Sequence, residues 1–179
     1  MPIAEPWQTA EIAGPKKASV ISKPDVADAI IKRAKHPVLI IGHLAAEIDL
    51  DDKKMIDYLL ELAQKGNIPV IATAHTNREL LKRGYTKAGI LPAVEVGHRL
   101  CDPDWKGIDG KEPYDLAIFA GLPYYMEWTI LSGLKHFAPY LKTMTLDNTY
   151  QPNASWSFSN ISVKDWVENL KVIIGNIEE

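Results

Sequence analysis

The residues of this sequence that are best suited to bind a ligand follow buried apolar runs. Gly42 comes directly after the apolar residues 38–41, and Gly121 comes directly after the apolar residues 116–120. A glycine at the end of a strand lets backbone N–H groups approach a phosphate, and Pro123 predicts a helix N-terminus that would attract the same anion. Glycine is also a common turn residue at such places, so both interpretations stay open. The candidate cofactor-binding residues are Gly42, His43, Ala74, Gly121, Leu122 and Tyr124.

The phosphate-binding motifs of the common nucleotide-binding enzymes are missing from these positions. From Gly42 onward the chain reads Gly-His-Leu-Ala-Ala in place of G-x-G-x-x-G. The sequence contains neither the P-loop pattern G-x-x-x-x-G-K-S/T nor the nucleophile pattern G-x-S-x-G. A standard Rossmann dehydrogenase, P-loop enzyme or α/β-hydrolase would therefore lack its characteristic site here. No nucleophile, base and orienting group occur together, so we predict no catalytic residue.

The single cysteine, Cys101, restricts the metal chemistry that this chain can perform. One thiol can form neither a disulfide within the chain nor a cysteine-rich zinc site, and an iron–sulfur cluster usually needs four thiolates. The five histidines stand singly, and although His43 and His75 follow neighbouring runs, no carboxylate or thiolate accompanies them. We therefore predict no metal site.

Aromatic side chains gather where the helix after the third apolar run should begin. Tyr124 and Trp128 are one helical turn apart, and Tyr125 lies beside them. Such a group could stack on a flavin ring, anchor a protein interface or pack in the core. Trp156 and Phe158, in a polar segment further along the chain, leave the same alternatives open.

These candidates must be positioned by alternating strands and helices. The apolar runs predict buried strands, which is typical of a parallel sheet covered on both faces. The fold class that follows is α/β, a three-layer α/β/α arrangement with a mainly parallel sheet. The expected strands are residues 38–41, 69–73, 116–120 and 141–146, and the expected helices are residues 24–34, 51–66, 77–83, 92–100, 123–137 and 162–177.

Several finer expectations accompany this pattern. Asp51 is the expected N-cap of the second helix, Phe137 is expected to face inward, and the alternating run 141–146 is expected nearer an edge of the sheet. Residues 1–23 have three prolines and no regular period, so we expect an extended N-terminal arm with Trp7 as its anchor. Residues 24–179 are expected to form a single Rossmann-like domain.

Composition excludes other classes of protein. The 179 residues are 46% hydrophobic and 24% charged, which is typical of a globular domain and argues against disorder. A net charge of −3 gives no basic excess for nucleic-acid binding. No apolar run approaches the roughly 20 residues that cross a bilayer, and the first residues do not resemble a signal peptide. We expect a soluble, cytoplasmic protein with no membrane partner.

Two resemblances to known families add to this interpretation. Residues 27–73 are similar to the central domain of thiamine-diphosphate enzymes, a class of domain that binds NAD or FAD in several relatives. The whole chain more specifically resembles the epsilon-subunit family of the archaeal acetyl-CoA decarbonylase/synthase (carbon monoxide dehydrogenase) complex. The stretches that carry this second resemblance are residues 35–42, 102–110, 114–118, 141–143 and 153–160.

The epsilon-subunit resemblance implies an accessory role. A small subunit of this family would bind a large alpha subunit that carries the nickel–iron–sulfur clusters, with two copies of each. It would stabilise that subunit and could assist electron transfer towards FAD. The family supplies no established catalytic residues to carry over. The cysteine count agrees, because a chain with one thiol cannot hold those clusters alone.

Two other functions stay open at this point. The chain could be a flavin- or NAD-binding protein that acts alone through the loops at Gly42 and Gly121. It could also be an NAD-dependent enzyme related by fold to protein deacylases, although fold by itself does not determine function.

Overall fold

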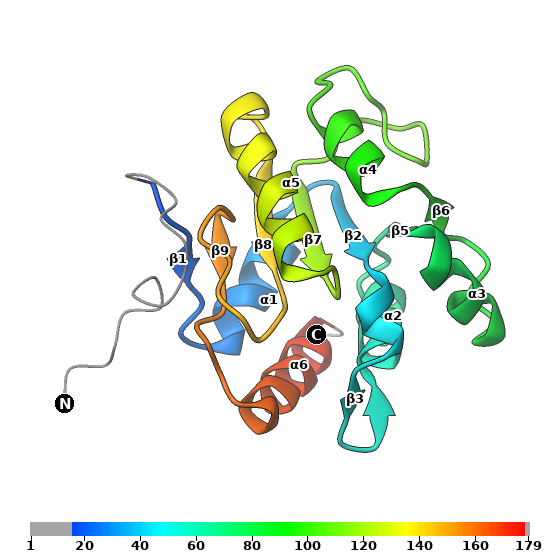
Figure 1. The fold of residues 1–179 in the computed structure, drawn as a ribbon, viewed down its shortest axis with the longest axis vertical. Helices are drawn as coiled ribbons and strands as arrows, with labels where there is room; N and C mark the ends of the chain where they lie inside the picture. Colours follow the sequence, from blue (N-terminus) through cyan, green and yellow to red (C-terminus); the bar gives the residue numbers. More distant parts are fainter. Residues whose placement is uncertain (1–15, 178–179) are drawn as a thin grey trace.

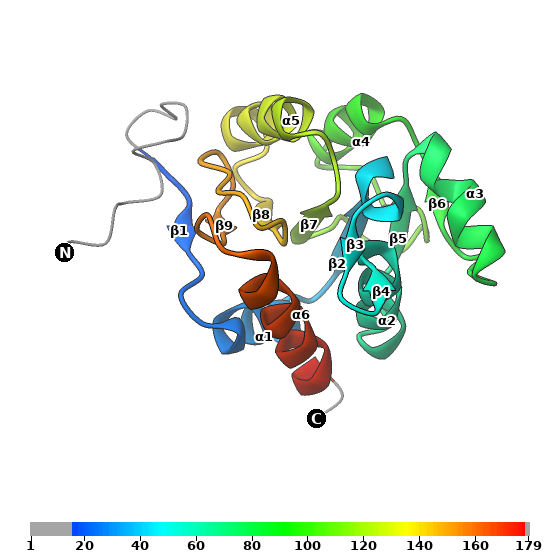
Figure 2. The same ribbon diagram turned by 60° about the horizontal axis from the view of Figure 1, so that its bottom comes forward.

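A computed structural model describes residues 16–177 of the chain, which form an α/β fold in three layers. Seven strands make one sheet in the order β1-β9-β8-β7-β2-β5-β6, and every neighbouring pair is parallel. Figures 1 and 2 show α4 and α5 on one face of the sheet and α1, α2 and α6 on the other. The predicted fold class is therefore confirmed.

The elements alternate along the chain as the apolar pattern predicts. The strands of the sheet are β1 (Ser19–Val20), β2 (Pro37–Ile41), β5 (Val70–Ala72), β6 (Gly89–Ile90), β7 (Leu116–Ala120), β8 (Lys142–Thr145) and β9 (Trp156–Ser157). The helices are α1 (Pro24–Arg33), α2 (Met55–Lys65), α3 (Ala74–Lys82), α4 (Ala93–Leu100), α5 (Tyr124–Phe137) and α6 (Val163–Ile177). A short 3-10 helix, η2 (His43–Ala46), and a two-stranded hairpin of β3 (Asp49–Leu50) and β4 (Lys53–Lys54) connect β2 to α2.

The central strands supply core residues to both faces of the sheet. In β2, Leu39 and Ile41 pack into the core beneath α1, α2 and α6, while Val38 and Ile40 pack into the core beneath α4 and α5. All four side chains are completely buried. Burial of an aliphatic side chain contributes about 1.5–3 kcal/mol, so such a run is stable only between two helical layers.

The helix ends follow local hydrogen bonding. At the start of α6, the N–H of Asp165 donates to Ser162 Oγ at 3.2 Å, which caps the helix. The last turn of α2 contains an ion pair between Lys65 Nζ and Glu61 Oε1 at 3.2 Å. Gly66 is the C-cap of this helix, and the left-handed residue is the next one, Asn67, with φ of 48°.

Three local expectations are corrected by the structure. Asp51 is not a helix cap, because it lies in the tight turn of the β3–β4 hairpin with φ of 56°, and α2 begins only at Met55. The N–H of Lys54 there donates to Asp57 Oδ2 at 3.0 Å. Phe137 does not face inward, because it ends α5 beyond the core and is 72% exposed.

The strand β8 lies further inside the sheet than its alternating pattern suggests. It pairs with β7 on one side and with β9 on the other, and β1 pairs with β9 beyond it. It is still the last long strand on that side, because β9 and β1 have two residues each. Strands this short leave no periodic signal in the sequence.

The described part of the N-terminal segment joins the sheet. Ser19 and Val20 pair with Trp156 and Ser157 of β9. Tyr150 Oη donates to the carbonyl oxygen of Ala18 at 2.7 Å, and this carbonyl belongs to a buried residue. The predicted anchor, Trp7, lies outside the described residues.

The long connection between α4 and β7 is attached to the end of the sheet at which the strands begin. His36 Nε2 lies 3.0 Å from Asp109 Oδ2, and the His36 ring stacks on Tyr114 with centroids 4.5 Å apart. Tyr114 Oη accepts the N–H of Ile108 at 3.0 Å. Although burial opposes the charge on Asp109, the hydrogen bond from His36 holds the pKa of this carboxyl below its usual value. These contacts give the turn-rich residues 102–110 a fixed path.

Within residues 16–177, no helix has the length and apolar character needed to cross a membrane.

Candidate functional site at the carboxyl ends of the strands

The predicted ligand loops meet at the point where the strand order reverses. From β2 the chain first builds outward to β5 and β6, and it then returns to place β7 on the other side of β2. Parallel sheets of this kind bind ligands beyond the carboxyl ends of the two strands at such a reversal. Gly42 and Gly121 follow these two strands, so the structure brings the two predicted glycines together.

The two glycine loops are in direct contact with each other. A Cβ atom at Gly42 would lie 2.1 Å from the carbonyl oxygen of Gly121, and one at Gly121 would lie 2.7 Å from Ala45 Cβ. Gly121 also has a left-handed backbone with φ of 72°. Both positions require glycine because the two backbones pack together. The two loops therefore touch directly beyond the ends of β2 and β7.

The backbone N–H groups at this point are used within the protein. The N–H of Gly42 donates to the carbonyl of Ala120 at 2.9 Å, and the N–H of Leu44 donates to the carbonyl of Gly121 at 3.0 Å. The N–H of Gly121 donates to the carboxylate of Asp147, at 2.9 Å to Oδ1 and 3.2 Å to Oδ2. A carboxylate of the protein thus takes the amide that would otherwise face a phosphate.

The remaining predicted residues surround this contact at different distances from it. His43 begins η2 and is half-buried, while Leu122 is buried directly after Gly121. Tyr124 begins α5, and its Oη donates to the carbonyl of Tyr150 at 3.4 Å. Ala74 begins α3 beyond β5, on the far side of β2 from β7. The structure gathers Gly121, Leu122 and Tyr124 beyond β7, whereas Ala74 begins a helix that packs against η2 on the other side of β2.

A small cavity remains beside these loops. Its volume is about 150 Å³, whereas sites for drug-sized ligands and cofactors usually occupy about 300–1,000 Å³. A few polar groups from residues 147–151 face a mainly apolar wall. The lining residues are Leu44, Ile48, Gly121, Leu122, Tyr124, Asp147, Asn148, Thr149, Gln151 and Trp166.

Two carboxyl groups lie together at the cavity: Asp147 lines it, and Glu127 lies next to Asp147. Glu127, on the first turns of α5, is completely buried. Burial, followed by the charge of Asp147, raises the pKa of Glu127 well above its ordinary value. Burial also raises the pKa of Asp147 to about 6, against the opposing effect of the Gly121 N–H. The pair therefore holds at least one proton at neutral pH, because two adjacent buried carboxylates cannot both be charged at low cost.

The candidate residues drawn from the sequence did not include Glu127 and Gln151. Glu127 lies three and four residues before Ile130 and Leu131, so it falls on the buried stripe of α5. A glutamate within an apolar stripe is the signal that could have identified it. Gln151 gave no such signal, because it follows a turn and becomes buried only through the hydrogen bond from its Nε2 to the carbonyl of Tyr124 at 3.1 Å.

An apolar groove lies between α4 and α5, away from the carboxyl ends of the strands. Its volume is about 420 Å³. Phe137 at one end and Val94 along its side are 72% and 55% exposed. The lining residues are Val94, Gly97, His98, Cys101, Met126, Thr129, Ile130, Gly133, Leu134 and Phe137.

Metal ligands do not gather in the described part of the chain. Residues 16–177 contain no group of three or more His, Cys, Asp and Glu side chains that could hold a metal ion. Cys101 is a half-buried thiol on the wall of the α4–α5 groove, and burial raises its pKa.

The fold and this site define a Rossmann-like α/β protein in which the loops at the strand reversal contact each other beside a small cavity. A family model described as CO dehydrogenase beta subunit/acetyl-CoA synthase epsilon subunit matches residues 2–174. The chain belongs to this family, and the resemblance drawn from its sequence is confirmed.

Relatives from three organisms support this assignment over most of their lengths. The acetyl-CoA decarbonylase/synthase complex subunit epsilon of Methanothermobacter thermautotrophicus is 38% identical over 168 residues, which are 93% of this chain and 92% of the relative. The subunit epsilon of Methanothrix soehngenii is 38% identical over 88% of this chain and 81% of its own length. The subunit epsilon 1 of Archaeoglobus fulgidus is 36% identical over 90% of this chain and 84% of its own length.

Substitution of Gly42 tests the contact between the loops. Gly42→Ala should lower the free energy of unfolding by about 3 kcal/mol or more, because the new methyl group would overlap the Gly121 backbone. Chemical denaturation measures this loss. Gly175→Ala is the control, because nothing lies within 4 Å of its Cβ position in α6, and it should be neutral or stabilising by about 0.5–1 kcal/mol. Equal stability of the Gly42 variant and the natural protein would contradict the contact.

The carboxyl pair predicts a stability that depends on pH. Because both pKa values are raised on folding, the stabilisation is complete below the ordinary carboxyl pKa and is lost as the pH rises through about 6 and higher. Glu127→Gln mimics the protonated acid. It should match the natural protein at about pH 4, below the ordinary carboxyl pKa, and exceed its free energy of unfolding by about 1 kcal/mol or more at about pH 8.

Urea denaturation at the two pH values measures this difference. Glu168→Gln changes an exposed glutamate of α6 and should show no such pH dependence. A Glu127→Gln effect of the same size at both pH values would show that Glu127 is not protonated in the folded protein.

Proposed function

We propose that this chain is a non-catalytic accessory subunit of an acetyl-CoA decarbonylase/synthase complex that binds the nickel–iron–sulfur carbon monoxide dehydrogenase alpha subunit. The names of the relatives support a place in that complex. The sequence supports the division of roles, because one cysteine cannot hold the clusters that carbon monoxide oxidation needs. In this proposal two copies of each subunit assemble, and the accessory subunit stabilises its partner.

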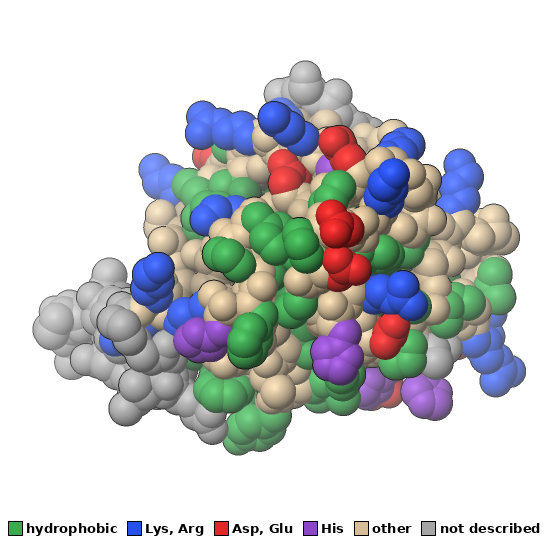
Figure 3. Space-filling view, turned by 90° about the horizontal axis from the view of Figure 1, so that it is seen from above, with side chains coloured by type: hydrophobic (Ala, Val, Ile, Leu, Met, Phe, Trp, Pro, Cys, Tyr) green, Lys and Arg blue, Asp and Glu red, His purple; other side chains and the backbone are tan. Residues whose placement is uncertain are grey.

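The observation that carries the proposal is the apolar groove between α4 and α5. The helices α4 and α5 present Val94, Met126 and Phe137 to solvent, although the same helices bury their other faces against the sheet. Figure 3 views the end of the molecule at which β2 and β7 begin, and hydrophobic side chains gather beside histidines along its lower side, where α4 and α5 lie. Exposed large apolar residues around a groove are typical of protein interfaces.

The occupant proposed for this groove is an apolar segment of the alpha subunit. Among the described residues that line the groove, only His98 can carry a charge, and only when it is protonated. An apolar helix or loop could therefore bind there without burying a charged group other than His98. Burial of the exposed Phe137 ring would supply the largest single contribution, because aromatic residues dominate interface energetics.

Charge placed in the groove should prevent this assembly. Phe137→Asp and Val94→Asp alter exposed side chains, so each variant should fold normally yet bind the alpha subunit at least about tenfold more weakly. Calorimetry or co-elution with the purified alpha subunit measures the binding. Val172→Asp, on the opposite layer at the exposed surface of α6, is the matched control and should bind normally. Unchanged binding by both groove variants would exclude the groove as the interface.

The electron-transfer role extends the proposal to FAD. The cavity at the carboxyl ends is too small for an isoalloxazine ring with its dinucleotide, so the isolated chain should not perturb the flavin spectrum. We expect the perturbation only when FAD is added to the assembled complex. Absorbance and fluorescence titrations of the chain, the alpha subunit and the complex measure it.

The three titrations have distinct outcomes. A change with the complex beyond the sum of its parts supports the role of FAD, and no change with any sample removes it. A change with the isolated chain would instead support the alternative of a flavin-binding protein that uses the loops at Gly42 and Gly121.

A further inference from the structure

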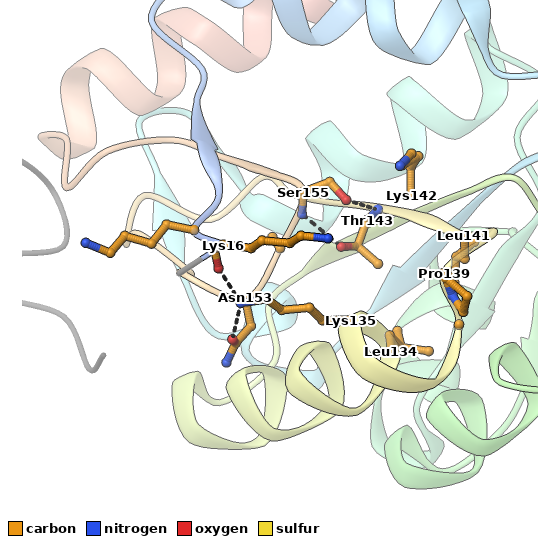
Figure 4. Close-up of a pocket in the computed structure, with 12 residues that line it drawn as sticks. Lys16, Leu134, Lys135, Pro139, Leu141, Lys142, Thr143, Asn153 and Ser155 are labelled. Carbon is orange, nitrogen blue, oxygen red and sulfur yellow. Dashed lines mark hydrogen bonds between the residues drawn. The ribbon is translucent and has the colours of Figure 1, made fainter. Parts of the chain in front are cut away.

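A second large cavity lies on the other side of α5 from the apolar groove. Its volume is about 450 Å³. Four segments surround it: the end of α5, the start of β8, the residues before β9 and the residues before β1. Figure 4 shows Lys16 and Lys135 on one side and Lys142 on another. The lining residues are Lys16, Lys17, Leu134, Lys135, Ala138, Pro139, Leu141, Lys142, Thr143, Asn153, Ala154 and Ser155.

The charge of this cavity is strongly positive. Four of its lining residues are lysines, and within the described chain no Asp or Glu is among the residues that line it. The protein as a whole has a net charge of −3, so a general basic excess does not explain this concentration of cations. An anion in this cavity would be attracted by these lysines.

Lys135 is held in place at the floor of the cavity. Its Nζ donates to the carbonyl oxygen of Lys16 and, at 3.4 Å, to Asn153 Oδ1 (Figure 4). Asn153 is itself buried and donates from Nδ2 to the carbonyl of Trp128 at 3.5 Å. Burial, together with the charge of Lys16, lowers the pKa of Lys135. A half-buried ammonium group is thus fixed before any ligand arrives.

Two hydroxyl groups add neutral donors to these cations. Thr143 Oγ1 accepts the N–H of Ser155 at 3.0 Å, and Ser155 Oγ accepts the N–H of Thr143 at 3.1 Å. Among the described residues, neither hydroxyl donates a hydrogen bond, so both O–H groups are available to an acceptor in the cavity. The reciprocal bonds hold the two side chains in place across β8 and the segment before β9.

We propose that this cavity binds a small organic ligand that carries two or more phosphoryl groups. Lysine recognises phosphate as a point charge and hydroxyl groups donate to its oxygens, and together these donors can surround a tetrahedral group from several sides. A planar carboxylate would favour the fork of an arginine, and the cavity has none. The volume is sufficient for a nucleoside diphosphate.

This site is independent of the proposed function. It lies at the end of the sheet where β8 begins, opposite the loops at Gly42 and Gly121, and it does not require the α4–α5 groove. Its physical origin also differs, because the anion is attracted by side chains from four segments and not by a helix N-terminus. Failure of one proposal therefore leaves the other unaffected.

Calorimetric titration of the full chain with tripolyphosphate tests the proposal. We expect one site per chain, with an affinity that is higher at about 0.01 M than at about 0.15 M ionic strength because salt screens the lysines. Lys16→Ala and Lys142→Ala should each weaken binding by about threefold, and the double variant by about tenfold. Both lysines are exposed, so these variants should retain the fold, which thermal melting would verify.

Two controls make the result specific. Lys164→Ala removes an exposed lysine of α6 far from the cavity and should leave the affinity unchanged. Citrate, a carboxylate of similar charge, should bind at least about tenfold more weakly than tripolyphosphate, and ADP should compete with tripolyphosphate. No heat from tripolyphosphate at low salt, equal binding of citrate, or full affinity in the double variant would each overturn the proposal.

Discussion

The contact between the loops after β2 and β7 constrains the rest of this structure. These two strands pair along their whole length, from Pro37 with Leu116 to Ile41 with Ala120. Beyond their ends the backbones stay together, because Gly42 and Gly121 present no Cβ atoms to each other. The sheet extends outward in both directions from this pair, so the joint sets the relative positions of both halves of the fold.

The same contact decides which chemistry the carboxyl ends can support. In nucleotide-binding relatives of this architecture, free amides and an open crevice at the strand reversal receive the phosphates. Here Asp147 takes the Gly121 N–H, and the carbonyl of Gly121 takes the N–H of Leu44. The carboxyl groups of Asp147 and Glu127, whose pKa values burial raises, lie together at a small cavity. At this edge the loops thus bond to the protein's own groups, and α5 separates an apolar groove from a basic cavity.

Much of the fold could be predicted, because the pattern of apolar residues in its long elements indicates which of their faces are buried. The strand Leu116–Ala120 was predicted with the bounds that it has, and the helices α4, α5 and α6 begin within a residue of their expected positions. Elements with few residues were missed: the hairpin around Asp51 and the two-residue strands β1, β6 and β9. A pair of residues shows no period, and such a strand forms only because a neighbouring strand is already present to receive its hydrogen bonds.

The sequence by itself determined the α/β class, the family and the absence of enough thiolates for a metal cluster, because these depend on residue types and on their order along the chain. Only the tertiary structure decided what each candidate residue does. Gly42 is required by the backbone of Gly121 and Gly121 by Ala45, about eighty residues away along the chain, and burial together with Asp147 raises the pKa of Glu127. Four lysines from three separate segments surround one cavity. Contacts and electrostatic interactions act through space over a few ångströms. The number of residues between two positions in the chain does not determine how far apart they lie in the folded protein.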